Sequence, residues 1–287
     1  MGERTRNAEI AFFGGSFTAI DRDYMLELLT VADECVKKYG FIGVRCSTRP
    51  DKIDEEVLKI LKEHSVTSIE LGAQSMSDRI LFMNDRGHDA QSVRDASALI
   101  KSFTYKEDQP FELGLQMMTG LYGSTAEDDI FTAHEIIKLK PKTVRIYPTI
   151  TLENTQLADL YRSGEYVPPT LEETVKLVSK LIPMFEENSI NVIRVGLHAS
   201  EEISDKRIAG PYHPAFKELC MSEILFNEIL KALELREKTC DEIIIKCSPK
   251  LLSACIGQKK GNIERLNSLG YKVRFTPDKE TERFSLL

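Results

Sequence analysis

Short apolar runs alternate with amphipathic stretches along the first 200 residues of the chain. A run of four to eight apolar residues bounded by turn residues is typical of a buried strand. Such runs occupy residues 8–15, 41–46, 67–71, 111–118, 143–148 and 190–197. The stretches between them repeat apolar residues at helical spacing, so the pattern predicts strand–helix–strand crossovers and a parallel sheet. The sequence therefore predicts an α/β fold built as a barrel or a partial barrel.

Local signals mark where several of the helices begin and end. Residues 25–39 carry one apolar face and precede Gly40, a residue suited to ending a helix. Asp54 is expected to cap the next helix. Further helices are expected at 76–83, 89–103, about 124–139 and 170–187. Two of them should begin in capping boxes, formed by Ser124 with Glu127 and by Thr170 with Glu173.

The pattern changes near residue 210, which divides the chain into predicted domains 1–210 and 211–287. The second begins with a long helix whose apolar stripe is imperfect. A small module in the order βααβ follows: a strand at 243–246, a helix at 249–255, a basic loop at 257–261, a helix up to 269 and a strand at 271–275. Ser248 and Asn262 are the residues expected to cap its two helices.

Polar residues follow the predicted strands and should gather on one rim of the barrel, where ligands bind in this architecture. They are Gly14, Gly15, Ser16, Ser47, Arg49, Gln74, Ser75, Gln116, Arg145, Tyr147, Arg194 and His198. The set holds no pair of carboxylates for acid–base work and no Ser-His-Asp arrangement. It is better suited to holding a polar cofactor than to hydrolysis. An ordinary tight turn is the alternative interpretation of the glycine pair when it is taken alone.

Composition adds limits to this interpretation. Hydrophobic residues make up 42% of the 287 residues, enough for a sizeable core, and no run is long enough to span a membrane. The net charge is -7, yet residues 241–287 hold nine Lys/Arg and six Asp/Glu, which is +3, and so leave about -10 for the rest. Six cysteines without framework spacing suggest reduced thiols and a cytoplasmic location.

Ordered motifs between residues 8 and 200 resemble the radical S-adenosylmethionine superfamily. They are Phe12-Phe-Gly-Gly-Ser-Phe-Thr, Ser47-Thr-Arg-Pro-Asp, Glu70-Leu-Gly-Ala-Gln-Ser, Asn84-Asp-Arg-Gly-His, Met117-Met-Thr-Gly-Leu and Arg145-Ile-Tyr-Pro-Thr followed by Leu160-Tyr-Arg-Ser-Gly. The likeness is greatest to the branch of the Elongator catalytic subunit and of proteins related to oxygen-independent coproporphyrinogen oxidase. The resemblance implies a partial barrel of the radical S-adenosylmethionine type.

The resemblance also implies roles for single residues. The backbone of Gly14 and Gly15 would receive the methionine amino group of S-adenosylmethionine, with Ser16 beside it. Gln74 and Arg86 match cofactor-contacting residues of the family. Ser47 lies near a position that is acidic in relatives, with Arg49 two residues on, and Gln116 stands where the oxidases have a ribose-binding Asp. Arg145 and Tyr147 would line the inner barrel wall.

The metal site of the superfamily is where the sequence departs from the resemblance. The superfamily holds a 4Fe-4S cluster on three cysteines, usually CxxxCxxC, after its first strand. The cysteines present are Cys35, Cys46, Cys220, Cys240, Cys247 and Cys255, and no three show cluster spacing. We therefore expect no metal bound by this chain and no radical reaction by this chain alone. An amino-terminally truncated form and a natural descendant without the cluster are the two explanations.

The tail resembles the core of a KH fold, in which a GxxG loop clamps a nucleic-acid backbone. Gly257, Lys259 and Lys260 are the candidate nucleic-acid-binding residues, although the second glycine comes one position late, at Gly261. A small cap with a solvated lysine loop is the alternative. Two functions stay open: a radical S-adenosylmethionine enzyme-like protein acting on RNA, or a non-catalytic barrel that binds RNA or a nucleoside-like ligand.

Overall fold

We analysed a computed structural model that describes residues 6–106, 109–198, 201–236 and 242–287. The chain forms two compact units, each with its own interior. The first comprises 1–168, 181–195 and 200–210, and the second comprises 169–180, 196–199 and 211–287. One limit between the units falls at 210/211.

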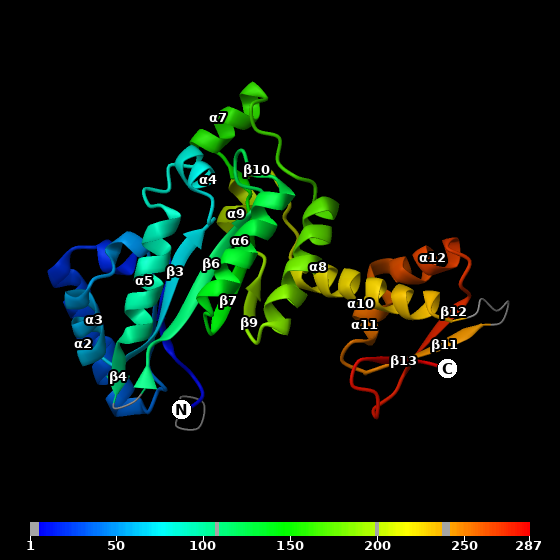
Figure 1. Ribbon diagram of the computed structural model, residues 1–287, viewed down its shortest axis with the longest axis horizontal. Coiled ribbons are helices and arrows are strands. Elements are labelled where there is room, and N and C mark those ends of the chain that lie inside the picture. The colour runs from blue at the N-terminus through cyan, green and yellow to red at the C-terminus, as the bar shows by residue number, and fades with distance from the viewer. Residues whose placement is uncertain (1–5, 107–108, 199–200, 237–241) are drawn as a thin grey trace. The chain divides into compact units, whose positions relative to one another are not determined.

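The first unit is built on a six-stranded parallel sheet in the order β1-β2-β3-β6-β7-β9, which curls into a half-barrel (Figure 1). Its strands are β1 (Ile10–Phe12), β2 (Val44–Thr48), β3 (Val66–Gln74), β6 (Glu112–Thr119), β7 (Thr143–Pro148) and β9 (Asn191–Val195). The predicted partial parallel barrel is therefore confirmed. Each pairing in this sheet joins strands that follow one another along the chain through helical crossovers, as the alternating pattern indicated.

Helices cover one face of this sheet, and α5 and α6 lie along β3 and β6 (Figure 1). The helices and turns are η1 (Phe17–Ala19), α2 (Arg22–Tyr39), η2 (Pro50–Lys52), α3 (Glu55–Glu63), α4 (Asp78–Met83), α5 (Ala90–Ser102), α6 (Ala126–Leu139), α7 (Gln156–Ser163), α9 (Glu201–Lys206) and the part of α8 (Leu171–Glu187) from residue 181 onward. Alternate strand residues such as Cys46, Ile69 and Leu71 are fully buried in the core. The residues between them carry polar side chains to the other face, which becomes the inside of the half-barrel.

The strand and cap predictions differ from the structure in detail. The predicted strand 8–15 shrinks to β1, because the chain turns away at Gly14, where φ is +102°. The first capping box is wrong by one residue: Thr125 and Asp128 form it, and the Ser124 hydroxyl donates to Asp129 instead. The Thr170–Glu173 box is confirmed, since the Thr170 hydroxyl accepts from the Glu173 N–H and its own N–H reaches the Glu173 carboxylate.

Short strands without a periodic signal were not predicted. β4 (Thr104–Lys106) pairs with β5 (Gln109–Pro110), and β8 (Thr151–Leu152) pairs with β10 (Arg207–Ala209). Strands of two or three residues are shorter than the four to eight residues over which alternation identifies a strand.

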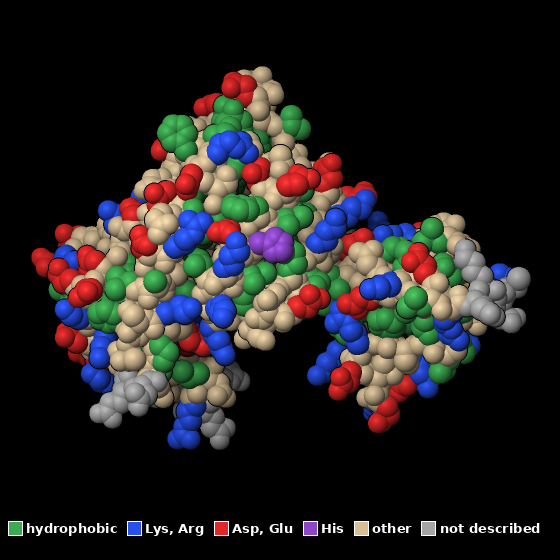
Figure 2. All heavy atoms as spheres, viewed as in Figure 1, with side chains coloured by type: hydrophobic (Ala, Val, Ile, Leu, Met, Phe, Trp, Pro, Cys, Tyr) green, Lys and Arg blue, Asp and Glu red, His purple; other side chains and the backbone are tan. Residues whose placement is uncertain are grey.

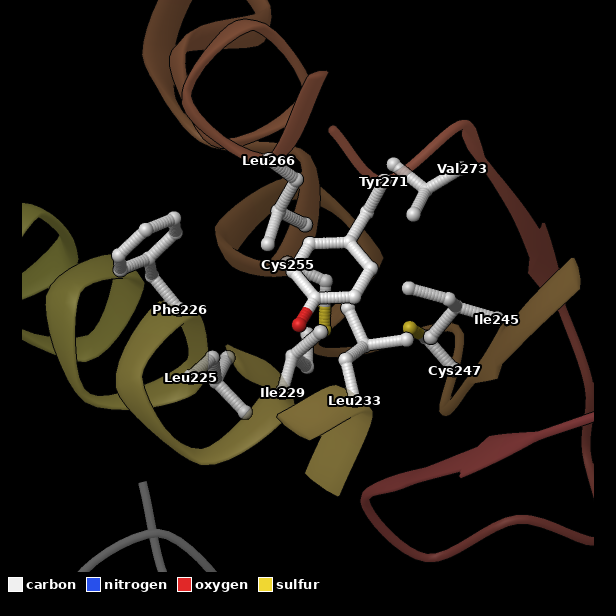
Figure 3. Packing of buried hydrophobic residues seen from close by; sticks show 10 residues of the cluster. All are labelled: Leu225, Phe226, Ile229, Leu233, Ile245, Cys247, Cys255, Leu266, Tyr271 and Val273. Carbon is white, nitrogen blue, oxygen red and sulfur yellow. The ribbon is translucent and has the colours of Figure 1, made fainter. Parts of the chain in front are cut away.

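The second unit contains α10 (Phe216–Glu234), β11 (Ile243–Cys247), α11 (Leu252–Ile256), η3 (Gln258–Lys260), α12 (Gly261–Ser268), β12 (Val273–Pro277) and β13 (Phe284–Leu286). The predicted small module with βααβ order is present, extended by β13. β11 is the central strand, parallel to β12 and antiparallel to β13. Figure 3 shows how one face of α10 packs with β11, α11, α12 and β12 around Cys247, Cys255 and Tyr271.

Asn262 is not the helix cap that its residue type suggested. α12 begins at Gly261, and its N-cap is Lys260, whose backbone is in the left-handed region (φ +65°). No side chain caps this helix. The Asn262 side chain is buried and its amide nitrogen lies 3.0 Å from Ser222 Oγ, 3.2 Å from Ala254 O and 3.1 Å from Cys255 O. Ser248 likewise gives α11 no side-chain cap, since that helix begins at Leu252.

Surface charges are mixed rather than segregated. On the face shown in Figure 2, Lys and Arg side chains are interspersed with Asp and Glu in each unit. None of the described helices combines the length and the apolarity that crossing a membrane requires.

Candidate functional site

A cleft of about 360 Å³ lies at the carboxyl ends of the first strands of the half-barrel. The loop after β1 and the carboxyl ends of β2 and β3 form it, together with Arg49 after β2, the segment after α4 and one residue of β6. Its lining residues are Gly15, Ser16, Ser47, Thr48, Arg49, Gly72, Gln74, Asp85, Arg86, His88 and Gln116. Polar and charged side chains dominate this set, so the cleft suits a polar ligand.

The turn after β1 gives the cleft an exposed backbone. Gly14 and Gly15 are exposed, and a Cβ added at either would meet no atom within 4 Å. Ser16 fixes the turn against the end of β2, because its hydroxyl accepts from the Arg49 N–H at 2.9 Å and bonds the Thr48 hydroxyl at 3.0 Å. A ligand can thus approach the backbone N–H and C=O groups of the glycine pair without steric obstruction.

The end of β3 is irregular, and this irregularity directs Gln74 into the cleft. The pairing of β3 with β6 shifts register between Gly72 and Gln74, and Gln74 has a φ of +61°. Bulges of this kind re-aim a side chain beside a site. A Cβ at Gly72 would lie 2.7 Å from Gln74 Nε2, so the glycine makes room for the amide. His88 Nε2 lies 3.2 Å from the Ala73 carbonyl oxygen and supports this strand end.

Two arginines bring positive charge to the cleft, and their surroundings differ. Arg49 binds Asp51 through two hydrogen bonds of 2.8 and 2.9 Å and donates to the Gly87 carbonyl at 2.9 Å. Arg86 has no carboxylate partner in the part of the chain that the structure describes. Burial lowers the pKa of Arg86, and the charge of Arg49 lowers it further. An uncompensated guanidinium in a cleft is an attractive partner for a carboxylate or phosphate.

A buried ion network inside the half-barrel supports the cleft from below. Glu70, with 1% of its surface exposed, accepts from Arg145 Nε at 2.6 Å and Nη2 at 2.9 Å. It also accepts from Gln116 Nε2 at 2.9 Å and from Arg45 Nη1 at 3.3 Å. Gln116 Nε2 lies 2.9 Å from the Ser47 hydroxyl as well. The network therefore fixes Gln116 and Ser47, two lining residues, to the centre of the sheet.

The sequence-predicted residues largely meet in this cleft. Gly15, Ser16, Ser47, Arg49, Gln74, Arg86 and Gln116 line it, and Gly14 lies next to it in the same turn. Arg145 is not among the lining residues, because Glu70 holds its guanidinium. Burial alone would lower the pKa of Arg145, and the hydrogen bond and charge of Glu70 raise it instead. Arg145 also stacks on the exposed Phe13 ring, 4.7 Å from the ring centre.

Sequence reasoning missed four lining residues: Thr48, Gly72, Asp85 and His88. Each lies in one of the motifs quoted above, one or two positions from Ser47, Gln74 or Arg86. That closeness in sequence could have identified them as lining residues.

The described cysteines do not fit an iron–sulfur cluster. Cys46 points to the buried core and burial raises the pKa of its thiol to about 12, and Cys220, Cys247 and Cys255 are buried in the second unit. Cys35 is half-buried on α2, and Cys240 lies outside the described residues. Among the residues described, no group of three His, Cys, Asp or Glu side chains could hold a metal ion.

One perturbed acid lies away from the cleft. Burial raises the pKa of Asp129 to about 6, although it accepts from the Gly120 N–H at 3.0 Å and the Ser124 hydroxyl at 2.7 Å. These bonds hold the turn after β6, so Asp129 has a structural explanation.

Comparison with known proteins gives consistent matches across most of the chain. Residues 2–136 match the domain of the Radical SAM superfamily, and residues 141–225 match the Radical_SAM C-terminal domain. A tRNA uridine(34) acetyltransferase of Methanocaldococcus jannaschii is 29% identical in an alignment of 199 positions that covers 62% of this chain and 36% of that protein. Human Elongator complex protein 3 is 25% identical over 64% of this chain and 36% of its own length. The chain thus spans about a third of the length of these relatives.

A solved structure shares the fold. Archaeal Elp3 from Methanocaldococcus infernus, with residues 1–46 deleted, superposes with a TM-score of 0.65 at 22% identity, covering 83% of this chain and 57% of that one.

Proposed function

Since the chain belongs to the Radical SAM superfamily, we propose that its cleft binds S-adenosylmethionine and that the protein acts on RNA in the manner of a tRNA-modifying enzyme. The observation that carries the proposal is the cleft itself, with Arg86 as a cation without a carboxylate partner among the described residues. The exposed glycine pair and the amides of Gln74 and Gln116 complete it.

The chemistry of the cleft fits this cofactor. S-adenosylmethionine carries a carboxylate, an amino group, a sulfonium and an adenosine. Arg86 would bind the carboxylate, and the carbonyl groups of the Gly14–Gly15 turn would accept from the amino group. Ser47, Gln74 and Gln116 offer hydroxyl and amide groups for hydrogen bonds with the ribose and the base. Arg49 adds positive charge beside Arg86.

The proposal does not include the 4Fe-4S cluster of the superfamily. In the superfamily a 4Fe-4S cluster supplies the electron that cleaves S-adenosylmethionine to a radical. The described cysteines do not gather to hold such a cluster, so we derive no radical step from this chain. The same observation favours a second candidate function, a barrel that binds RNA or a nucleoside-like ligand without radical chemistry.

The RNA part of the proposal rests on the relatives and on the second unit. The relatives include proteins named tRNA uridine(34) acetyltransferase. Lys259 and Lys260 are exposed in the loop before α12, with φ values of +52° and +65°. A loop with exposed lysines at a helix N-terminus suits phosphate oxygens, as in a KH-like module. A cytoplasmic location belongs to the same proposal, supported by the free described cysteines.

Replacing Arg86 with methionine should weaken S-adenosylmethionine binding by about 10- to 100-fold, because a charge-assisted hydrogen bond contributes about 1.5–3 kcal/mol. Isothermal titration calorimetry on the purified chain measures this. Arg79→Met is the matched control, since Arg79 binds Asp128 and the Gly123 carbonyl outside the cleft. If the unaltered chain does not bind S-adenosylmethionine, or if Arg86→Met binds it equally well, the assignment of the cleft is wrong.

Reversing two charges in the loop, Lys259→Glu with Lys260→Glu, should weaken binding of transfer RNA and flatten its salt dependence. Each phosphate that the loop no longer neutralises lowers the slope of log affinity against log salt by about 0.7–0.9. Fluorescence anisotropy at several salt concentrations measures both quantities. Lys272→Glu with Lys279→Glu changes the charge of the same unit equally at exposed positions away from the loop. Equal losses in both double variants would show a general charge effect and no role for the loop.

A further inference from the structure

A second, smaller pocket lies in the second unit, between α10 and α11. Its volume is about 220 Å³, and Gln258, the residue after Gly257 in the basic loop, forms part of its wall. Small-molecule sites of drug size measure about 300–1,000 Å³, so this pocket suits a fragment the size of a single heterocycle. We call it the α10–α11 pocket.

The polar side chains around the α10–α11 pocket have unused hydrogen-bonding capacity. Within the described chain, the side chains of Glu218, Lys250, Ser253 and Gln258 make no hydrogen bond and no ion pair. A carboxylate, an ammonium, a hydroxyl and an amide therefore face one small space, while Leu219 and two alanines supply apolar wall. Mixed donors and acceptors beside apolar wall match the edge and the faces of a planar base.

The walls of the pocket are held in place from behind. Asn262 Nδ2 lies 3.0 Å from the Ser222 hydroxyl and 3.2 Å from the Ala254 carbonyl, so one buried amide ties α10 to α11. Because the Ser222 oxygen accepts from Asn262, the hydroxyl hydrogen of Ser222 is available to a ligand. A pocket held by a buried side chain is organised before its ligand arrives, which limits the entropy lost on binding.

We propose that the α10–α11 pocket binds one unstacked base of single-stranded RNA, while the adjoining loop at 257–261 contacts its phosphate. The inference rests on the proposed action on RNA and adds the strand type and the base class. Gln258 belongs to both the loop and the pocket wall, so one nucleotide can reach both. No aromatic side chain lines the pocket, so hydrogen bonds to the base edge select the base rather than stacking.

The charges of the pocket select among bases. Glu218 accepts an N–H from the base, and Lys250 donates to a carbonyl oxygen. Uracil presents a ring N–H and carbonyl oxygens on one edge, whereas adenine has no carbonyl oxygen. The pocket therefore prefers a carbonyl-bearing base such as uracil over adenine.

The test compares short oligouridylate and oligoadenylate of equal length by fluorescence anisotropy on the full chain. We expect a preference for uridylate of about tenfold. The variant Glu218→Ala with Lys250→Ala should lose that preference and keep its affinity for adenylate. Both positions are exposed, and the pair leaves the net charge unchanged. The control is Lys231→Ala with Glu234→Ala, which removes the same two charges from exposed positions on α10 outside the pocket.

The outcomes separate this inference from the proposed function. Equal affinity of the unaltered chain for the two oligonucleotides, or an unchanged preference in the pocket variant, overturns the base pocket while RNA binding stands. Failure of the unaltered chain to bind any RNA overturns both. Loss of the preference in the pocket variant, with the control unaffected, supports the assignment. The Lys259→Glu and Lys260→Glu variant should instead lower the affinity for both oligonucleotides together.

Discussion

Replacing Glu70 with alanine should lower the free energy of unfolding of the first unit by about 3–5 kcal/mol. The carboxylate is buried and receives hydrogen bonds from Arg145, Gln116 and Arg45. Its removal leaves the largely buried Arg145 guanidinium without a carboxylate partner among the described residues, while Arg45 keeps its pairs with Glu9 and Glu112. Urea denaturation followed by circular dichroism measures the loss.

Two further variants separate the effect of the buried Glu70 charge on stability from the effect of losing an ordinary exposed ion pair. Glu153→Ala breaks the exposed ion pair in which Arg162 Nη2 lies 3.0 Å from Glu153 Oε2. This change should lower the free energy of unfolding by less than about 1 kcal/mol. Glu70→Gln keeps the shape and one acceptor but loses the charge, so its cost should lie between those of the other two. A loss for Glu70→Ala no larger than that for Glu153→Ala would contradict the central role of the network.

Replacing Asn262 with aspartate should destabilise the second unit by about 2–4 kcal/mol at neutral pH, more than replacing it with alanine. The amide donates toward the Ser222 hydroxyl and the carbonyls of Ala254 and Cys255, all of which are acceptors toward it. A carboxylate there would face carbonyl oxygens and lie buried, so its pKa would rise. The protonated acid is less destabilising than the carboxylate. The loss in free energy of unfolding should therefore grow as pH rises from about 4 to about 8.

Thermal denaturation at several pH values measures this effect. Asn267→Asp introduces the same charge on an exposed position of α12 and should leave the unit almost unchanged. If Asn262→Asp is as stable as Asn267→Asp across this range, the buried amide does not hold the three helices together.

The sequence alone was sufficient to predict most of the cleft, because the carboxyl ends of parallel strands must meet on one edge. Ser16, Ser47 and Gln74 lie at or after the ends of three different strands and still meet there, whereas Arg86 was expected only from the family resemblance. Arg145 shows the limit of this reasoning. It also follows the strand pattern, but its partner Glu70 is 75 positions away, and no local signal reveals that pair.

Two residues whose type suggests a helix cap, Asn262 and Ser124, have other roles because of contacts that the local sequence does not reveal. Asn is a favoured helix cap, and Asn262 stands at the right place for one. Contacts with Ser222, 40 positions earlier, bury it instead, and the helix starts without a side-chain cap. The capping box of α6 shifted by one residue because Ser124 and Thr125 are both suitable, and the burial of Asp129 draws the Ser124 hydroxyl away.

The Glu70 network also bears on how the first unit folds. Its bonds join positions 25, 46 and 75 residues apart, on β2, β3, β6 and β7. Each of these contacts closes a long loop, whose entropy is lost before the contact forms. We therefore expect the network to form late in folding. An interaction that forms late acts mainly on the rate of unfolding, so the network should chiefly slow the opening of the half-barrel.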